Sequence, residues 1–200
     1  TALPSSPSLE AGELSLVAGA WMIPHVEKAD KGGEDAYFIS AAGLGGVGVA
    51  DGVSGWADEG IDPADYPRTL MRHAASAWDG ARGEAAAVDI IRYAQGRTAL
   101  RGSSTVCLAL MRPGGVLETA NVGDSGIRII RRGTIVYASE AQQHSFNMPF
   151  QLSHPSCVEA PDTADDADVV ALQVEEGDIV LLATDGLYDN MFDEEIASVV

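Results

Sequence analysis

Two apolar segments that each end in an Asp-Gly pair constrain this chain most. The run in GGVGVADGVSGW ends at Asp51-Gly52, and the run in GDIVLLATDGLYDN ends at Asp185-Gly186. Strands buried on both faces read as continuous hydrophobic runs, so both segments are predicted to be buried strands. A carboxylate at the end of such a strand is held rigidly at the rim of the core. The two strand ends could therefore share a metal ion.

Composition limits the class of protein. The chain has 200 residues with 46% hydrophobic content, which suits one globular domain with a sizeable core. Its 12 Lys and Arg against 30 Asp and Glu give a net charge of −18, which opposes nucleic-acid binding through a basic surface. No segment approaches the roughly 20 apolar residues of a membrane-spanning helix. We therefore expect no nucleic-acid partner and no membrane span.

The chain is predicted to comprise a short leader and one domain. The Pro- and Ser-rich residues 1–12, TALPSSPSLEAG, are interpreted as a flexible leader, and residues 13–200 as the domain. A first strand is expected over Glu13 to Ile23 and a second over Asp35 to Ala41. The loop of residues 140–168 is expected to be long.

Residues 70–100 show helical periodicity, and most of the later segments show strand patterns. Leu70, Ala74, Ala77 and Trp78 lie at helical spacing, and residues 84–100 predict a second, adjacent helix. Further short strands are expected over residues 104–111, 116–122, 125–133, 134–139, 169–174 and 178–184, with a hairpin turn at Arg132-Gly133. Residues 193–200 begin like a helix. The pattern from Ser103 onward indicates antiparallel β architecture.

Several acidic residues next to glycines are candidates for the site. Glu34 and Asp35 follow Gly32-Gly33. In a regular strand their side chains would point to opposite faces, so they could be equivalent ligands only if the backbone is irregular there, which the two glycines would allow. Asp124 lies between two glycines in ANVGDSG, and Asp189 follows Asp185 after the longest apolar strand. A lone Asp-Gly pair is most often an ordinary turn.

Asp51 and Asp185 differ from such turns because each ends a strong apolar strand. An unpaired charge is costly there unless a cation compensates it. Ligands that are all oxygen suit magnesium or manganese better than zinc. Paired ions of this kind can hold a hydroxide nucleophile and clamp a phosphoryl oxygen, so the chemistry predicted is phosphoester hydrolysis.

Other motifs do not fit their templates. The acidic DTADDADVVALQ has Ala167 where a calcium loop needs glycine and Gln173 where it needs glutamate. The glycine-rich GGVGVADG lacks the lysine and hydroxyl of a nucleotide P-loop. The hydroxyls of residues 103–105 are not part of a GxSxG elbow and are interpreted as a strand entry.

Five ordered motifs resemble one known family. GGEDAYF, GVADGVSGW, GSSTVCLALM, ANVGDSG and ATDGLYDN, in this order and spacing, are similar to the metal-dependent serine/threonine protein phosphatases of type 2C. DPADYPRTLM and EAQQHSFNMPFQLS resemble the branch of mitochondrial and plastid phosphatases typified by yeast Ptc-seven. The resemblance extends from about Glu13 to the last residue.

The resemblance implies a fold and a metal centre. The fold would be an α+β sandwich of two antiparallel β-sheets flanked by α-helices, with two manganese or magnesium ions in a cleft at one end. Asp51 would bridge both ions. Glu34 and the Gly52 carbonyl would bind one ion, and Asp185 the other.

The resemblance also implies roles for the remaining acidic residues and for partners. Asp35 would hold a metal-bound water, and Asp124 and Asp189 match residues that bind a weaker third ion. A water activated by the ions would attack phosphoserine or phosphothreonine in a phosphoprotein substrate. We further expect a monomer, and the branch suggests a mitochondrion or plastid.

Three departures from the family pattern keep alternatives open. Val53 stands where many members carry a histidine that can protonate the leaving oxygen. Asp30 stands where an arginine usually grips phosphate, with Lys28 and Lys31 nearby. The family's last metal-binding aspartate would lie beyond Val200, so the domain is expected to lack its C-terminal end and the chain itself to be weakly active or inactive. A catalytically impaired or regulatory relative, or a phosphatase of small phosphoesters, are the alternatives.

Overall fold

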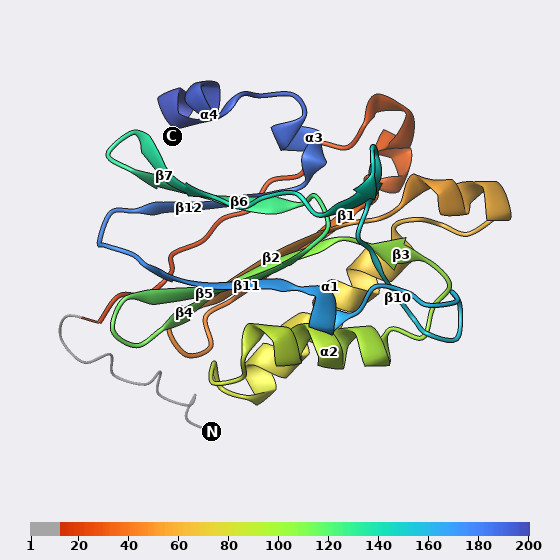
Figure 1. Cartoon of the computed structure of the whole chain (residues 1–200), viewed down its shortest axis with the longest axis horizontal. Helices are drawn as coiled ribbons and strands as arrows, with labels where there is room; N and C mark the ends of the chain where they lie inside the picture. The colour runs from red at the N-terminus through yellow and green to blue at the C-terminus, as the bar shows by residue number, and fades with distance from the viewer. Residues whose placement is uncertain (1–12) are drawn as a thin grey trace.

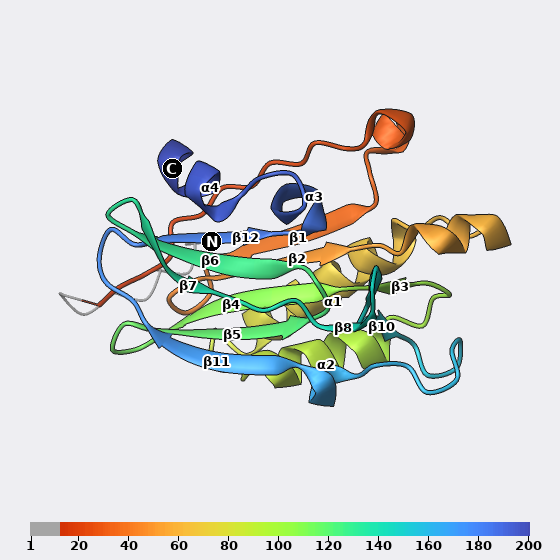
Figure 2. The same cartoon turned by 45° about the horizontal axis from the view of Figure 1, so that its top comes forward.

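Two antiparallel β-sheets lie face to face in the structure, a computed structural model that describes residues 13–200 (Figures 1 and 2). The larger sheet has the strand order β1 (Asp35–Ser40), β2 (Gly46–Asp51), β4 (Val106–Arg112), β5 (Val116–Val122) and β11 (Asp168–Gln173). The smaller sheet has the order β12 (Ile179–Ala183), β6 (Gly126–Arg131) and β7 (Thr134–Ala138). The leader expected over residues 1–12 lies outside the described residues.

Two long helices cover the outer face of the larger sheet (Figure 2). Helix α1 (Asp65–Gly80) packs on β1 and β2, and α2 (Ala87–Arg97) packs on β4 and β5. Leu70, Ala74 and Trp78 are buried as predicted, while Ala77 is only partly buried. Shorter helices are η1 (Val26–Lys31), η2 (Ser54–Glu59), η3 (Ala164–Asp166), α3 (Asp185–Tyr188) and α4 (Asp193–Val199). The predicted α+β sandwich of two antiparallel sheets with flanking helices is confirmed, and in the described residues α4 contacts β7 on the smaller sheet.

Strand β4 divides the core into two layers. Val106, Leu108 and Leu110 pack toward the helices, whereas Cys107 and Ala109 pack between the two sheets. This alternation follows from the two-residue side-chain period of a strand. Strand β4 is therefore buried on both faces.

The prediction that β2 and β12 are buried on both faces was wrong. Side chains of β2 alternate between buried and partly buried, and those of β12 are partly buried or exposed. Strand β12 is at the edge of its sheet in the described residues, which explains its exposure. Along β2 two glycines make room for neighbours, since a Cβ on Gly48 would lie 2.5 Å from the Phe38 ring.

The first predicted strand, Glu13 to Ile23, was also wrong. These residues carry no regular secondary structure, and Val17, Trp21 and Ile23 are exposed by 99%, 89% and 82%. The amide of Leu16 donates to the carbonyl of Leu44 at 2.8 Å. A strand needs a continuous hydrogen-bonded neighbour, which hydrophobic content alone cannot supply.

The turn chemistry was predicted correctly at the β6–β7 hairpin. Arg132 and Gly133 have φ angles of 52° and 74°, the left-handed values that a two-residue hairpin turn requires. The long loop of residues 140–168 contains the short strands β8 (Gln143–Ser145), β9 (Met148–Pro149) and β10 (Leu152–Ser153). Strand β8 pairs with β9, and β10 pairs with β3 (Ser103–Ser104). None of the helices in residues 13–200 combines the length and hydropathy of a bilayer-crossing segment.

A partly buried ion pair links the end of β6 to the entry of β12. Arg131 Nε and Nη2 donate to the two oxygens of Asp178 at 2.8 and 2.7 Å, and the Asp178 side chain is only 3% exposed. The hydrogen bonds from Arg131 hold the pKa of Asp178 below its ordinary value. A lowered carboxyl pKa contributes stability above the unfolded-state pKa, and that contribution disappears as the pH falls through the folded-state pKa.

We therefore expect Asp178→Asn to lower the free energy of unfolding by about 1–3 kcal/mol at pH 7. Urea denaturation at several pH values measures this effect. The difference from the wild type should begin to shrink as the pH falls below about 4, the ordinary pKa of aspartate, and should disappear as the pH passes the lower folded-state pKa. Glu175→Gln is the matched control, because Glu175 pairs with the same arginine but is 56% exposed. A pH-independent difference would contradict the assigned role of the charge.

Candidate functional site

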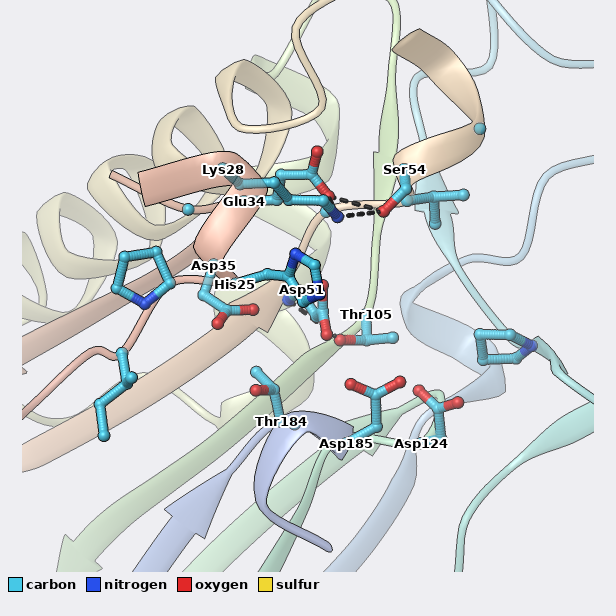
Figure 3. Close-up of a pocket in the computed structure, with 18 of the residues that line it drawn as sticks. His25, Lys28, Glu34, Asp35, Asp51, Ser54, Thr105, Asp124, Thr184 and Asp185 are labelled. Carbon is cyan, nitrogen blue, oxygen red and sulfur yellow. Dashed lines mark hydrogen bonds and ion pairs between the residues drawn. The ribbon is translucent and has the colours of Figure 1, made fainter. Parts of the chain in front are cut away.

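A pocket at one end of the sandwich brings most of the predicted site residues together (Figure 3). Its volume is about 480 Å³, which is ample for a phosphorylated side chain. Six of the seven predicted residues line it, namely Glu34, Asp35, Asp51, Gly52, Asp124 and Asp185. The seventh, Asp189, is not among its lining residues.

The sheet topology explains why distant acidic residues meet here. Asp35 and Asp51 are directly opposite each other in the antiparallel β1–β2 pair, so their side chains share a face. Asp185 begins α3 immediately after β12, and Asp124 lies in the connection from β5 to β6. Figure 3 shows Asp185 and Asp124 facing Asp35 and Asp51 across the pocket.

The electrostatics of Asp51 indicate an uncompensated negative charge. Burial, followed by the charges of Asp35 and Asp185, raises the pKa of Asp51 to about 9. Burial also raises the pKa of Asp35, with further contributions from Asp185 and Glu34. Like charges held this close retain a proton or require a cation.

Asp124 lies close enough to both Asp185 and Asp189 for their charges to interact. Burial raises the pKa of Asp124, and the charges of Asp185 and Asp189 add to the effect. Asp189 caps the C-terminal end of α3, where its amide donates to the Asp185 carbonyl at 2.8 Å. Asp189 thus contributes charge to the site from outside the lining of the pocket.

Gly52 is required by a close approach of the backbone. A Cβ at this position would lie 2.2 Å from the Pro63 carbonyl oxygen and 2.9 Å from that of Glu34. The Gly52 amide donates to the same Glu34 carbonyl at 3.2 Å. The absent side chain therefore lets the end of β2 pack against the segment that presents Glu34.

Glu34 points away from the other carboxylates. Its Oε2 forms an ion pair with Lys28 and accepts a hydrogen bond from Ser54 Oγ at 2.6 Å. Figure 3 shows these three side chains joined at the upper rim of the pocket, apart from Asp35 and Asp51. Glu34 precedes β1, which begins at Asp35, so the opposite-face rule of a regular strand does not apply to this pair, and both residues line the pocket.

Hydroxyl groups support the site, and sequence reasoning gave them no role there. Thr105 lines the pocket, and its Oγ1 accepts a hydrogen bond from the Asp51 amide at 3.1 Å. Thr105 Oγ1 also lies 2.6 Å from Ser125 Oγ. A run of three hydroxyl residues before the apolar β4 was the available signal. The side chain at position 53, Val53, lines the pocket but offers no proton donor.

The side chains of the pocket suit a hard divalent cation such as magnesium or manganese. Within residues 13–200, no three His, Cys, Asp or Glu side chains already converge into a metal-binding cluster. The ligands on offer are nevertheless all oxygen, and three of them are partly buried carboxylates with raised pKa values. Oxygen ligands of this kind suit magnesium and manganese.

Comparison with known proteins identifies the family. The sequence model described as protein phosphatase 2C matches residues 41–199. The chain belongs to the protein phosphatase 2C family. Among curated relatives of this family, "Probable protein phosphatase 2C 26" of Arabidopsis thaliana is 41% identical over 94% of this chain and 62% of its own length. The "Protein phosphatase PTC7 homolog" of Homo sapiens is 42% identical over 80% of this chain and 57% of its own length.

Solved protein phosphatase 2C structures share the fold. The structure described as the photosystem II phosphatase PBCP is 38% identical, with a TM-score of 0.84 over 88% of this chain and 69% of that chain. The catalytic domain of the phosphatase PstP, solved with two manganese ions, has a TM-score of 0.59 at 17% identity, covering 82% of this chain and 76% of its own. The chain spans between 47% and 62% of the length of three curated plant relatives.

Proposed function

We propose that this chain is part of a metal-dependent protein serine/threonine phosphatase that hydrolyses phosphoserine and phosphothreonine. One observation carries the proposal: Asp35, Asp51 and Asp185, from three separate segments, crowd into one pocket where the pKa of Asp51 is raised to about 9. Such crowding is costly unless cations neutralise it. Family membership supports the same chemistry.

The pocket residues would hold two manganese or magnesium ions. Asp51 would contact both, with Glu34 and the Gly52 carbonyl on one side and Asp185 on the other. Asp124 and Asp189 would hold a third, weaker ion. When bound, such ions generate a nucleophile from water at neutral pH and neutralise phosphoryl charge.

The remaining chemistry falls to the side chains themselves. Asp35 would orient a water molecule in the pocket, and Thr105 fixes the backbone of Asp51 through its hydrogen bond. Because Val53 has no proton to donate, another group of the pocket or water would protonate the leaving serine or threonine oxygen. A phosphate dianion would be repelled by the carboxylates without metal, so both substrate binding and turnover would depend on it.

The partners follow from the same reasoning. The substrate would be a phosphoprotein, and the protein would act as a monomer. The PTC7 homologs among its relatives support the Ptc-seven branch, for which we propose a mitochondrial or plastid location.

Phosphate release from a phosphothreonine peptide tests this function. We expect the full-length protein to release phosphate with Mn²⁺, to lose this activity in excess EDTA and to regain it when Mn²⁺ is restored. Binding of Mn²⁺ without phosphate release would support a regulatory relative instead. Release from small aryl or sugar phosphates but not from phosphopeptides would indicate a small-molecule phosphatase.

A further inference from the structure

Lys28 is the one lysine or arginine among the residues that line the pocket in the described chain. It enters from η1, on the same side as Glu34 (Figure 3). All other charged lining residues except His25 are acidic. A single cation in a pocket of carboxylates decides where an incoming anion can bind.

Lys28 is held by two acceptors at the rim. Its ammonium forms an ion pair with Glu34 Oε2 and donates to Ser54 Oγ at 2.8 Å. Ser54 in turn donates to Glu34 Oε2 at 2.6 Å. One carboxylate oxygen of Glu34 therefore accepts from both groups.

This arrangement conflicts with metal binding at Glu34. A divalent ion bound to this carboxylate and the ammonium group of Lys28 would repel each other. The Lys28 side chain is 36% exposed, whereas that of Glu34 is 14% exposed, so Lys28 can move more easily. A lysine has a flexible four-carbon stem and three rotatable donors, which suit it to exchange one anionic partner for another.

The backbone beneath Lys28 is anchored independently. Arg68 of α1 donates to the carbonyl oxygens of Lys31 and Gly33 at 2.9 and 3.1 Å. The segment between η1 and Glu34 is thus fixed to α1. The exchange requires only a change of side-chain rotamer at Lys28.

We propose that Lys28 is an internal counter-ion, which occupies Glu34 until a metal ion displaces it and then binds the phosphate group of the substrate. The proposal rests on the proposed function, because it takes Glu34 as a metal ligand. It gives the pocket a phosphate-binding cation although Asp30 and Val53 offer none. It also couples the two events, since phosphate binding by Lys28 follows its release from Glu34.

The test compares Lys28→Met with Lys28→Arg and Lys31→Met. Methionine keeps the length of the side chain and removes the charge, whereas arginine keeps the charge. Lys31 is a matched control because it belongs to the same η1 turn and does not line the pocket. Titration calorimetry of the metal-free protein with Mn²⁺ gives the metal Kd, and inhibition by inorganic phosphate in the Mn²⁺-loaded protein gives its Ki.

We expect Lys28→Met to bind Mn²⁺ about two- to fivefold more tightly, the scale of a partly exposed ion pair. The Ki of phosphate should rise about tenfold, because a charge-assisted contact is lost. Lys28→Arg should restore the Ki, and Lys31→Met should change neither quantity. Opposite movement of the two constants is not the result of general structural damage.

Unchanged or weaker Mn²⁺ binding by a folded Lys28→Met variant would overturn the counter-ion role. An unchanged phosphate Ki would overturn the phosphate-binding role. Neither result contradicts the proposed function, provided that the wild type binds Mn²⁺ and releases phosphate. A folded wild type that binds no Mn²⁺ would instead refute the proposed function, and the inference with it.

Discussion

Asp51→Ala is expected to lower Mn²⁺-dependent phosphate release from a phosphothreonine peptide at least about a thousandfold, or about 4 kcal/mol in kcat/KM. Asp51 lies between Asp35 and Asp185 and is the residue that we propose contacts both ions. Its loss would remove a ligand from each ion at once. Steady-state kinetics at saturating Mn²⁺ measure the effect.

A second readout separates this role from a structural one. Without metal, the buried Asp51 carboxyl group is crowded by two others, so Asp51→Asn should raise the stability of the metal-free protein by about 1–3 kcal/mol. Asp58→Ala, at an exposed position of η2, is the control and should change neither activity nor stability. Retained activity in Asp51→Ala, or a less stable Asp51→Asn protein, would argue against the proposed centre.

Gly52→Ala is expected to destabilise the protein by about 3 kcal/mol or more. The added Cβ would lie 2.2 Å from the Pro63 carbonyl oxygen, which is a backbone atom, so relief of the clash requires the backbone of Pro63 or of Gly52 to shift. Overpacking of this kind costs typically 1–3 kcal/mol, and a clash with backbone lies at the upper end. Urea denaturation of the metal-free protein measures the loss independently of any bound ion.

Gly55→Ala is the matched control for this substitution. Gly55 lies three residues further on in η2, and a Cβ there meets no atom within 4 Å. Its replacement should change the free energy of unfolding by about 0.5 kcal/mol or less. Equal stability of the two alanine variants would show that the approach of Pro63 to Gly52 is not a constraint in solution.

Local sequence patterns predicted the elements whose causes are local. The apolar faces of α1 and α2 follow from helical spacing, and the β6–β7 turn follows from the left-handed conformation that Arg132-Gly133 adopts. Asp51 and Asp185 were found because each ends an apolar run, and the other acidic candidates because they lie near glycines and match the motifs of the family. Six of the seven lie in one pocket, as a shared site requires.

Features that depend on distant neighbours were not predictable in this way. The apolar residues 13–23 resemble a strand, but strand formation depends on a partner that the local pattern does not specify. The exposure of β12 reflects its place at a sheet edge. The contacts of Glu34 with Lys28 and Ser54 form because η1 and η2 meet at the rim of the pocket. Glu34 and Ser54 are 20 residues apart in the sequence, so no local pattern specifies this contact.

Anomalous diffraction at the manganese edge from crystals grown with Mn²⁺ tests the central claim most directly. We expect two strong peaks in the pocket, with the Asp51 carboxylate in contact with both and Asp185 in contact with one. Clear density for the protein with no anomalous peak within bonding distance of Asp51 or Asp185 would contradict it.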